Sequence, residues 1–231
     1  VDFDPVHAKM QGRAPEGMDD ATAALFPDSF EELGVEPTPK GWHRRKLGDV
    51  CAYLNRGISP KYLETGGVLV INQKCIRDFS IDYEKARRHD PIQRKIDGRQ
   101  LMIGDVLVNS TGVGTLGRVA QVLALPEVAI VDSHVTVVRA GESLTWSYLG
   151  QWMTRMQPEI EAMGEGSTGQ TELARSKLSE LSILVPGVEV LSAFDAIVLS
   201  LKHRIAVNEA SASELIKLRD TLLPRLISGQ I

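Results

Sequence analysis

Short runs of β-branched residues, each bounded by turn residues, dominate the middle of the chain from Trp42 onward. Runs of this length and composition are typical of β-strands. We therefore predict strands over residues 67–72, 105–110, 117–123, 128–132 and 135–139.

A helix over residues 145–163 is predicted from apolar positions that recur every three or four residues, and we interpret this stripe as core. Thr145 is the expected N-cap, and Pro158 is expected to kink or end the helix. A polar, glycine-rich loop at 164–170 then leads to Thr171 as the cap of a short helix and to a strand at 181–186. The loop is either a contact surface or a solvated connection.

The C-terminal segment carries a heptad pattern sustained for more than four repeats. A helix over 188–223 would be roughly 54 Å long at about 1.5 Å per residue, and Pro224 is expected to stop or kink it. No second long heptad segment exists in the chain, so the seam is expected to pair with another helix; a helix lying along its own β domain is the alternative. Asn208 at a seam position would fix the register. The predicted helix-pairing residues are Phe194, Val198, Leu201, Ile205, Asn208, Leu215 and Leu222.

The stretch STGVGTLGRV at 110–119 contains three glycines in the G-x-G-x-x-G spacing of a dinucleotide-binding turn. Such a turn must open a helix, whereas the residues that follow are rich in valine and isoleucine and predict further strands. A phosphate-binding P-loop would need Lys and then Ser or Thr where Arg118 and Val119 stand. We therefore interpret the stretch as a glycine-permitted turn between antiparallel strands.

Charge is distributed unevenly along the chain, whose net charge is −4. Residues 1–41 carry 3 basic and 9 acidic side chains, residues 42–120 carry 14 and 8, and residues 121–231 carry 9 and 13. The acidic first segment, punctuated by Pro and Gly, predicts a linker with one turn of helix near residues 20–25. The basic middle is the footprint expected of a contact with phosphates, although the overall acidity argues against a general nucleic-acid coat.

The chain lacks the motifs of the common enzymes that act on DNA. It has no Asn/Asp-Pro-Pro-aromatic motif of amino-methyltransferases, no acid-x-Lys pair of common nucleases and no G-x-S-x-G nucleophile elbow. Its five histidines show no ligand spacing, so no catalytic residue and no metal site are predicted. Cys51 and Cys75 suit a reducing compartment as two packed thiols, and no apolar run is long enough to span a membrane, so we expect a cytoplasmic protein.

Four stretches of the chain resemble the specificity subunit of type I restriction–modification systems. They are GWHRRKLGDV at 41–50, GDVLVNSTGVGTLGRVA at 104–120, GSTGQTELARSKLSELSILVP at 166–186 and LRDTLLPRLISGQI at 218–231. The opening VDFDPVHAKMQGRAPEGM also resembles the linker that follows the first long helix in that family.

This resemblance implies a non-catalytic subunit with two target-recognition domains, each followed by a long helix. Each domain would read half of a split DNA site, and the two helices would pack antiparallel and dock methyltransferase (M) subunits that use S-adenosylmethionine. A separate translocase–nuclease (R) subunit would use ATP and magnesium. No cofactor is expected in this chain itself.

The chain matches only part of that layout, and we expect an α+β fold. A linker at 1–41 would follow a missing first helix, one mixed α/β target-recognition domain would occupy 42–186, and a long coiled-coil-forming helix for dimerisation and spacing would occupy 187–231. The chain would then be the C-terminal half of a longer subunit or a half-size subunit. In isolation it is expected to form a homodimer.

Two functions remain open: a reader of double-stranded DNA, and a coiled-coil scaffold whose β domain binds protein without DNA. The basic middle favours DNA, because Arg, Lys, Asn and Gln read base edges in the major groove, whereas a protein-binding face favours aromatic anchors. The candidate DNA-binding residues of that segment are Lys61, Asn72, Gln73, Lys74, Arg77, Arg87, Arg88 and His89. Those of the two glycine-rich loops are Ser110, Thr111, Thr115, Arg118, Ser167, Thr168 and Gln170.

Overall fold

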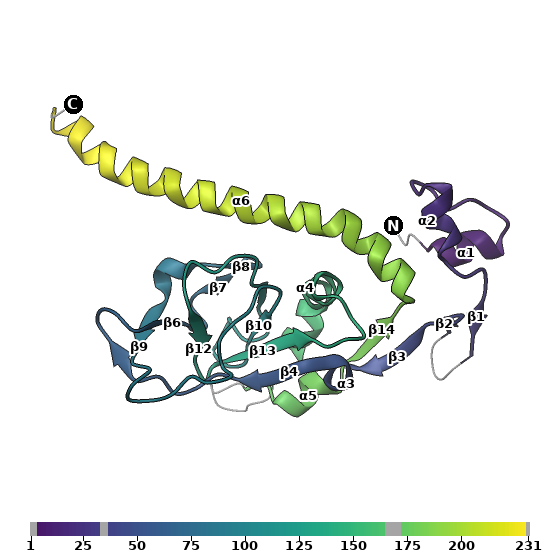
Figure 1. Cartoon of the computed structure of the whole chain (residues 1–231), viewed down its shortest axis with the longest axis horizontal. Coiled ribbons are helices and arrows are strands. Elements are labelled where there is room, and N and C mark those ends of the chain that lie inside the picture. The colour runs from purple at the N-terminus through teal and green to yellow at the C-terminus, as the bar shows by residue number, and fades with distance from the viewer. Residues whose placement is uncertain (1–3, 33–36, 165–171, 230–231) are drawn as a thin grey trace. The chain divides into compact units, whose positions relative to one another are not determined.

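Two four-stranded sheets lie in the first of two units, Val1–Asp195 and Ala196–Ile231, of the computed structural model (Figure 1). The structure describes residues 4–32, 37–164 and 172–229. One sheet, with the strand order β11-β10-β13-β4, is antiparallel and contains β4 (Cys51–Arg56), β10 (Val106–Asn109), β11 (Val119–Gln121) and β13 (Val135–Ala140). The other, with the order β12-β6-β9-β5, contains β5 (Tyr62–Leu63), β6 (Val68–Ile71), β9 (Arg87–His89) and β12 (Ala129–Val131).

Shorter elements surround these sheets. The N-terminal part contains α1 (Pro5–Met10), α2 (Asp20–Ala24), β1 (Phe30–Glu31) and β2 (Thr38–Pro39). Next to the sheets lie β3 (His43–Lys46), α3 (Leu47–Val50), β7 (Ile76–Arg77), β8 (Ser80–Ile81), the 3-10 turn η1 (Tyr83–Lys85), α4 (Trp146–Ala162), α5 (Arg175–Ser179) and β14 (Ser182–Val185). β3 pairs with β14 antiparallel, so residues far apart in sequence close this end of the unit.

Strand β10 is buried along its whole length, which explains its continuous apolar run. Successive side chains of a strand point to opposite faces, so Val106 and Val108 belong to one hydrophobic core and Leu107 to another. The first core also contains Leu149 and Met153 of α4, and the second contains side chains of both four-stranded sheets. β10 therefore holds the unit together from both faces.

Helix α4 covers the first core with the fully buried Leu149, Met153 and Ile160, and Thr145 caps it as predicted. The helix runs through Pro158, so of the two expected outcomes, a kink or an end, the end is excluded. A proline inside a helix costs about 3 kcal/mol. Burial of three large apolar side chains, each worth about 1.5–3 kcal/mol, offsets that cost.

Helix α6 (Val188–Ile227) begins in the first unit and forms the second. Its length agrees with the heptad prediction, but it continues past Pro224, so Pro224 does not stop it. Most of its apolar side chains are exposed, including Leu201 at 57% and Leu215 at 65%. Among the described residues, no helix is both long and apolar enough to cross a membrane.

The fold agrees with the predicted α+β class, and each strand and helix predicted between residues 67 and 227 is present. The short helix α5 has Ala174 as its N-cap, and Thr171, the predicted cap, lies outside the described residues. The 110–119 stretch is confirmed as a turn between antiparallel strands, because β10 pairs with β11 in the register Val106↔Gln121 to Val108↔Val119. No strand was predicted between Trp42 and residue 67, where β3, β4 and β5 lie, or between residues 73 and 104, where β7, β8 and β9 lie. The N-terminal elements α1, β1 and β2 were not predicted either.

Candidate nucleic-acid interface

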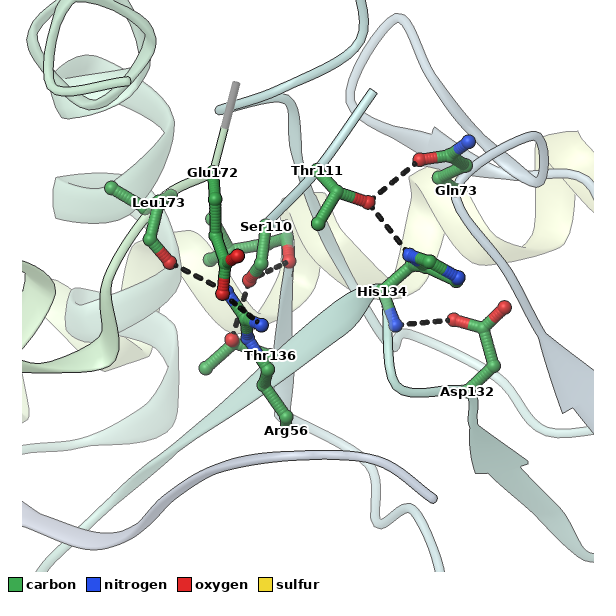
Figure 2. Close-up of polar contacts among 10 residues, drawn as sticks. Arg56, Gln73, Ser110, Thr111, Asp132, His134, Thr136, Glu172 and Leu173 are labelled. Atoms are coloured by element: carbon green, nitrogen blue, oxygen red, sulfur yellow. Dashed lines mark hydrogen bonds and ion pairs between the residues drawn. The ribbon is translucent and has the colours of Figure 1, made fainter. Parts of the chain in front are cut away.

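Three turns meet at one end of the two sheets, and each follows a buried strand. β6 and β12 are parallel with Ile71 opposite Val131, so the turns that follow these residues leave the sheet at the same edge. Asn109 of β10 lies opposite Val135 of β13, which brings the 110–118 hairpin turn to that edge as well. The side chains of Gln73, Thr111 and His134 meet there, and we call these three residues the polar edge (Figure 2).

Hydrogen bonds join the three residues of the polar edge. The hydroxyl of Thr111 donates to Oε1 of Gln73 at 3.2 Å, and it lies 2.8 Å from Nδ1 of His134. The His134 backbone N–H donates to Oδ1 of Asp132 at 2.9 Å, which orders the turn that carries the histidine. Burial raises the pKa of Asp132, while this hydrogen bond and the nearby histidine oppose the rise. His134 is exposed, and Gln73 and Thr111 are half-buried.

Buried polar side chains next to the polar edge form hydrogen bonds that fix the backbone of its turns. Asn109 donates from Nδ2 to the backbone carbonyl of Gln73 at 3.1 Å, and the hydroxyls of Ser110 and Thr136 lie 2.6 Å apart. Oδ1 of Asn109 is buried and has no hydrogen-bond partner among the described residues. Ser110 is fully buried, so its side chain cannot contact DNA; its prediction as a DNA-binding residue is corrected to a structural role.

Two glycines of the hairpin turn let it approach its neighbours closely. A Cβ on Gly112, whose φ is +103°, would lie 2.6 Å from Oε1 of Gln73. A Cβ on Gly117 would lie 2.5 Å from the Cα of Glu161 in α4. The contact at Gly117 is with backbone and excludes any larger residue, whereas at Gly112 the positive φ disfavours other residues and Gln73 would have to shift. The glycine spacing that resembles a nucleotide-binding motif therefore serves to pack the hairpin between the Gln73 turn and α4.

Arg56 of β4 holds the segment that follows the second glycine-rich loop, and this segment is hydrogen-bonded in turn to the hairpin. Its guanidinium donates to Oε1 of Glu172 at 2.6 Å and to the backbone carbonyl of Leu173 at 2.8 Å. The Leu173 N–H in turn donates to the carbonyl of Ser110 at 2.8 Å. The candidates Ser167, Thr168 and Gln170 lie outside the described residues.

The other predicted DNA-binding residues differ in their exposure and in the partners of their side chains. The guanidinium of Arg87 lies 3.3 Å from the centroid of the Tyr62 ring and is exposed. Arg88 instead makes two hydrogen bonds to Glu127, at 2.6 and 2.8 Å, and these lower the pKa of the Glu127 carboxyl. Lys61, Lys74 and Arg77 are exposed, whereas Asn72, Thr115 and Arg118 are half-buried.

His89 is fully buried, so its prediction as a base-reading residue is wrong. Its Nδ1 accepts the Lys61 N–H at 2.9 Å, and its Nε2 then carries the proton and donates to the Arg94 carbonyl at 2.8 Å. The histidine therefore joins two loops of the unit. His134 is the exposed histidine at the polar edge, and sequence reasoning considered it only as a metal ligand.

The predicted helix-pairing residues all lie on α6, far along the chain from the residues of the polar edge. Leu201, Ile205 and Leu215 are exposed, and Asn208 is exposed at its seam position. Val198 and Leu222 are half-buried. Phe194 packs edge-on against Tyr148 of α4, with ring centroids 5.7 Å apart, so it is a packing residue of the first unit and not a free pairing residue.

The chain is similar in sequence to two type I restriction enzyme specificity subunits. It is 24% identical to the MjaIX subunit of Methanocaldococcus jannaschii over 214 residues, which are 87% of this chain and 46% of that protein. It is 29% identical to the HindI subunit of Haemophilus influenzae over 90 residues, which are 39% of this chain and 20% of that protein. The matched regions thus span less than half the length of either relative. No protein-family model matches the chain.

Solved structures share its fold. A type I restriction–modification S subunit from M. genitalium matches with a TM-score of 0.57 and 17% identity, over 88% of this chain and 49% of that chain. A chain from a type I R-M system, solved to describe complex assembly and conformational transition, matches with a TM-score of 0.54 and 19% identity, over 95% and 51%. At these identities the likeness establishes the fold.

Proposed function

We propose that this chain, a relative of the specificity subunits of type I restriction enzymes, is a non-catalytic reader of one half of a bipartite DNA target. The polar edge would read bases, and α6 would dock methyltransferase subunits of the complex. S-adenosylmethionine, ATP and magnesium would be bound by the methyltransferase and translocase–nuclease subunits. The protein would act in the cytoplasm, where its DNA lies.

The polar edge is the single observation that carries this proposal. Base edges are read by hydrogen-bonding side chains that reach into a groove, and such side chains must be held in a fixed orientation to discriminate between bases. Gln73, Thr111 and His134 come from three different turns and are fixed by mutual hydrogen bonds. Asn109 beneath them fixes the backbone of Gln73.

DNA binding also requires attraction to the phosphates, which exposed cations on the same unit would supply. Lys61, Lys74, Arg77 and Arg87 are exposed, and contacts of such groups with phosphates provide affinity and register without sequence information. The charge of Arg88 is already neutralised by Glu127, so we expect it to contribute less.

The test is selection of binding sites from a random duplex library by the full chain, alone and assembled with a methyltransferase subunit. The expected result is a short consensus that the chain binds at least about a thousandfold more tightly than random duplex at the same salt concentration. Enrichment of no sequence under either condition would overturn the proposal.

The exposed apolar side chains of α6 favour a second candidate, a coiled-coil scaffold that binds protein without DNA. Both candidates predict a partner on α6, so partner binding does not separate them. The selection experiment does: a chain that assembles with its partner and enriches no duplex sequence is a scaffold.

A further inference from the structure

The hydrogen bonds at the polar edge fix which nitrogen of His134 carries its proton. A threonine hydroxyl has one hydrogen, and Thr111 donates it to Oε1 of Gln73. The contact between Thr111 and Nδ1 of His134 must then run the other way, with Nδ1–H donating to the hydroxyl oxygen. A neutral imidazole with its hydrogen on Nδ1 has a bare lone pair on Nε2. In its neutral form, His134 therefore presents a hydrogen-bond acceptor at its outer nitrogen.

The same bonds orient the amide of Gln73. Its Oε1 accepts from Thr111, so its Nε2 and the two hydrogens on it are directed elsewhere. Gly112 packs directly against this amide, and Asn109 fixes the backbone below it. Figure 2 shows Nε2 of His134 and Nε2 of Gln73 both pointing away from Thr111. The polar edge thus presents one acceptor and one donor from adjacent side chains.

We propose that His134 and Gln73 together read an adenine in the major groove, an inference that rests on the proposed function. Adenine presents an acceptor, N7, beside a donor, the N6 amino group. Nε2 of Gln73 would donate to N7, and Nε2 of His134 would accept from the N6 amino group. Guanine presents two acceptors, thymine an acceptor and a methyl group, and cytosine only a donor, so none of them satisfies both groups. Thr111 acts as a positioning residue.

The experiment measures binding of the full chain to its selected duplex with single-atom changes in adenine. One analogue lacks the N6 amino group, and the other has carbon in place of N7. Each change should weaken wild-type binding about tenfold at one position of the consensus. His134→Ala should lose about as much affinity and become insensitive to removal of the amino group while remaining sensitive to the N7 change. Gln73→Ala should show the reverse pattern.

Two further variants test the positioning role and the site. Thr111→Val removes the hydroxyl that fixes both neighbours, so it should reduce discrimination at the same adenine and leave the other consensus positions unchanged. His43→Ala, which removes an exposed histidine of β3, should keep the wild-type response to both analogues.

Failure of this inference differs from failure of the proposed function. If the His134→Ala variant selects the same consensus as the wild type at every position, the adenine assignment is overturned and DNA reading remains. The same holds if the base whose recognition depends on His134 is a guanine. Absence of any wild-type consensus overturns both.

Discussion

Gly112 determines how closely the hairpin turn approaches Gln73. Its φ of +103° is unfavourable for other residues, and a Cβ there would meet Oε1 of Gln73 at 2.6 Å as well as the Thr115 hydroxyl. Gly112→Ala should therefore lower the free energy of unfolding by about 1–3 kcal/mol, as measured by chemical denaturation. It should also impair DNA discrimination, because Gln73 must move.

Val113 offers a matched control in the same turn, since it is 78% exposed. Val113→Ala should change the free energy of unfolding by less than about 0.5 kcal/mol. If the two variants were equally stable, the contact between Gly112 and Gln73 would not constrain the turn.

The two cysteines predict a loss of stability at high pH. Burial raises the pKa of Cys51 to about 12 and that of Cys75 to about 11, above the ordinary value of 9.0. The unfolded chain then releases these protons first as the pH rises, so the stabilising effect is complete below about pH 9 and is lost between about pH 9 and 12.

The measurement is the free energy of unfolding of the wild type and of a Cys51→Ala, Cys75→Ala double variant as a function of pH. The wild type should lose stability more steeply than the double variant above pH 9, by up to about 1.4 kcal/mol per pH unit for each thiol. Parallel curves would show that the thiols ionise equally in both states. Both thiols should also resist alkylation until the chain unfolds.

At the residue scale, the sequence indicated which side chains have suitable hydrogen-bonding groups, but it did not indicate which of them are exposed. Gln73 and Thr111 were selected for their hydrogen-bonding groups and lie at the polar edge. His89 and Ser110 were selected on the same grounds and are buried. The difference depends on which face of a strand or turn meets a core, and for short elements such as β9, with three residues, no alternation in the sequence reveals that face.

Elements with a large apolar component were predictable, and polar ones were not. β10, β12 and β13 bury nearly every residue, so their composition identified them. β3 has the sequence HRRK and exposes all four residues, so it carries no apolar signal; its strand conformation depends on pairing with β14. Pro158 was overweighted because a local rule was applied without the buried contacts of α4 that oppose it. Packing does not explain the case of Pro224, because the residues around it are largely exposed and α6 continues to Ile227.

Strand β9 supplies a prediction about salt dependence, because its two arginines differ. Arg87 stacks on Tyr62 and is exposed, whereas Arg88 is paired with Glu127. Arg87→Ala should reduce the slope of log affinity for duplex DNA against log salt by about 0.9, the value for one phosphate contact. Arg88→Ala should change the slope less.

Filter binding or fluorescence anisotropy over a range of salt concentrations measures both slopes. Arg225→Ala, which removes an exposed arginine near the end of α6, is the control and should leave the slope unchanged. A larger effect for Arg88 than for Arg87 would mean that the ion pair with Glu127 opens on DNA and that the free structure does not represent the bound one.

At the scale of the whole molecule, the polar edge could not be predicted from spacing. Gln73, Thr111 and His134 are separated by 38 and 23 residues along the chain. They meet because β6 and β12 run parallel while β10 and β13 run antiparallel, and no local pattern specifies that pairing. The heptad seam is the opposite case, because a single continuous helix brings its residues into line.

The seam of α6 leads to the last prediction, which concerns oligomeric state. Leu201, Ile205 and Leu215 are exposed in the single chain, and burying each would contribute about 1.5–3 kcal/mol. Two copies related by a two-fold axis would bury the same stripe on each helix. We therefore expect the isolated chain to be a dimer at tens of micromolar in sedimentation equilibrium.

Leu201→Glu combined with Leu215→Glu should convert that dimer to a monomer, because four carboxylates would have to be buried at the pairing surface. The β-sheet unit should remain folded, as judged by its thermal transition. Ser200→Glu combined with Thr221→Glu adds the same charge at two exposed positions off the seam and should leave the dimer intact. A wild-type chain that is monomeric at this concentration would mean that the seam is reserved for a different subunit, and equal dissociation by both double variants would mean that charge, and not the seam, controls association.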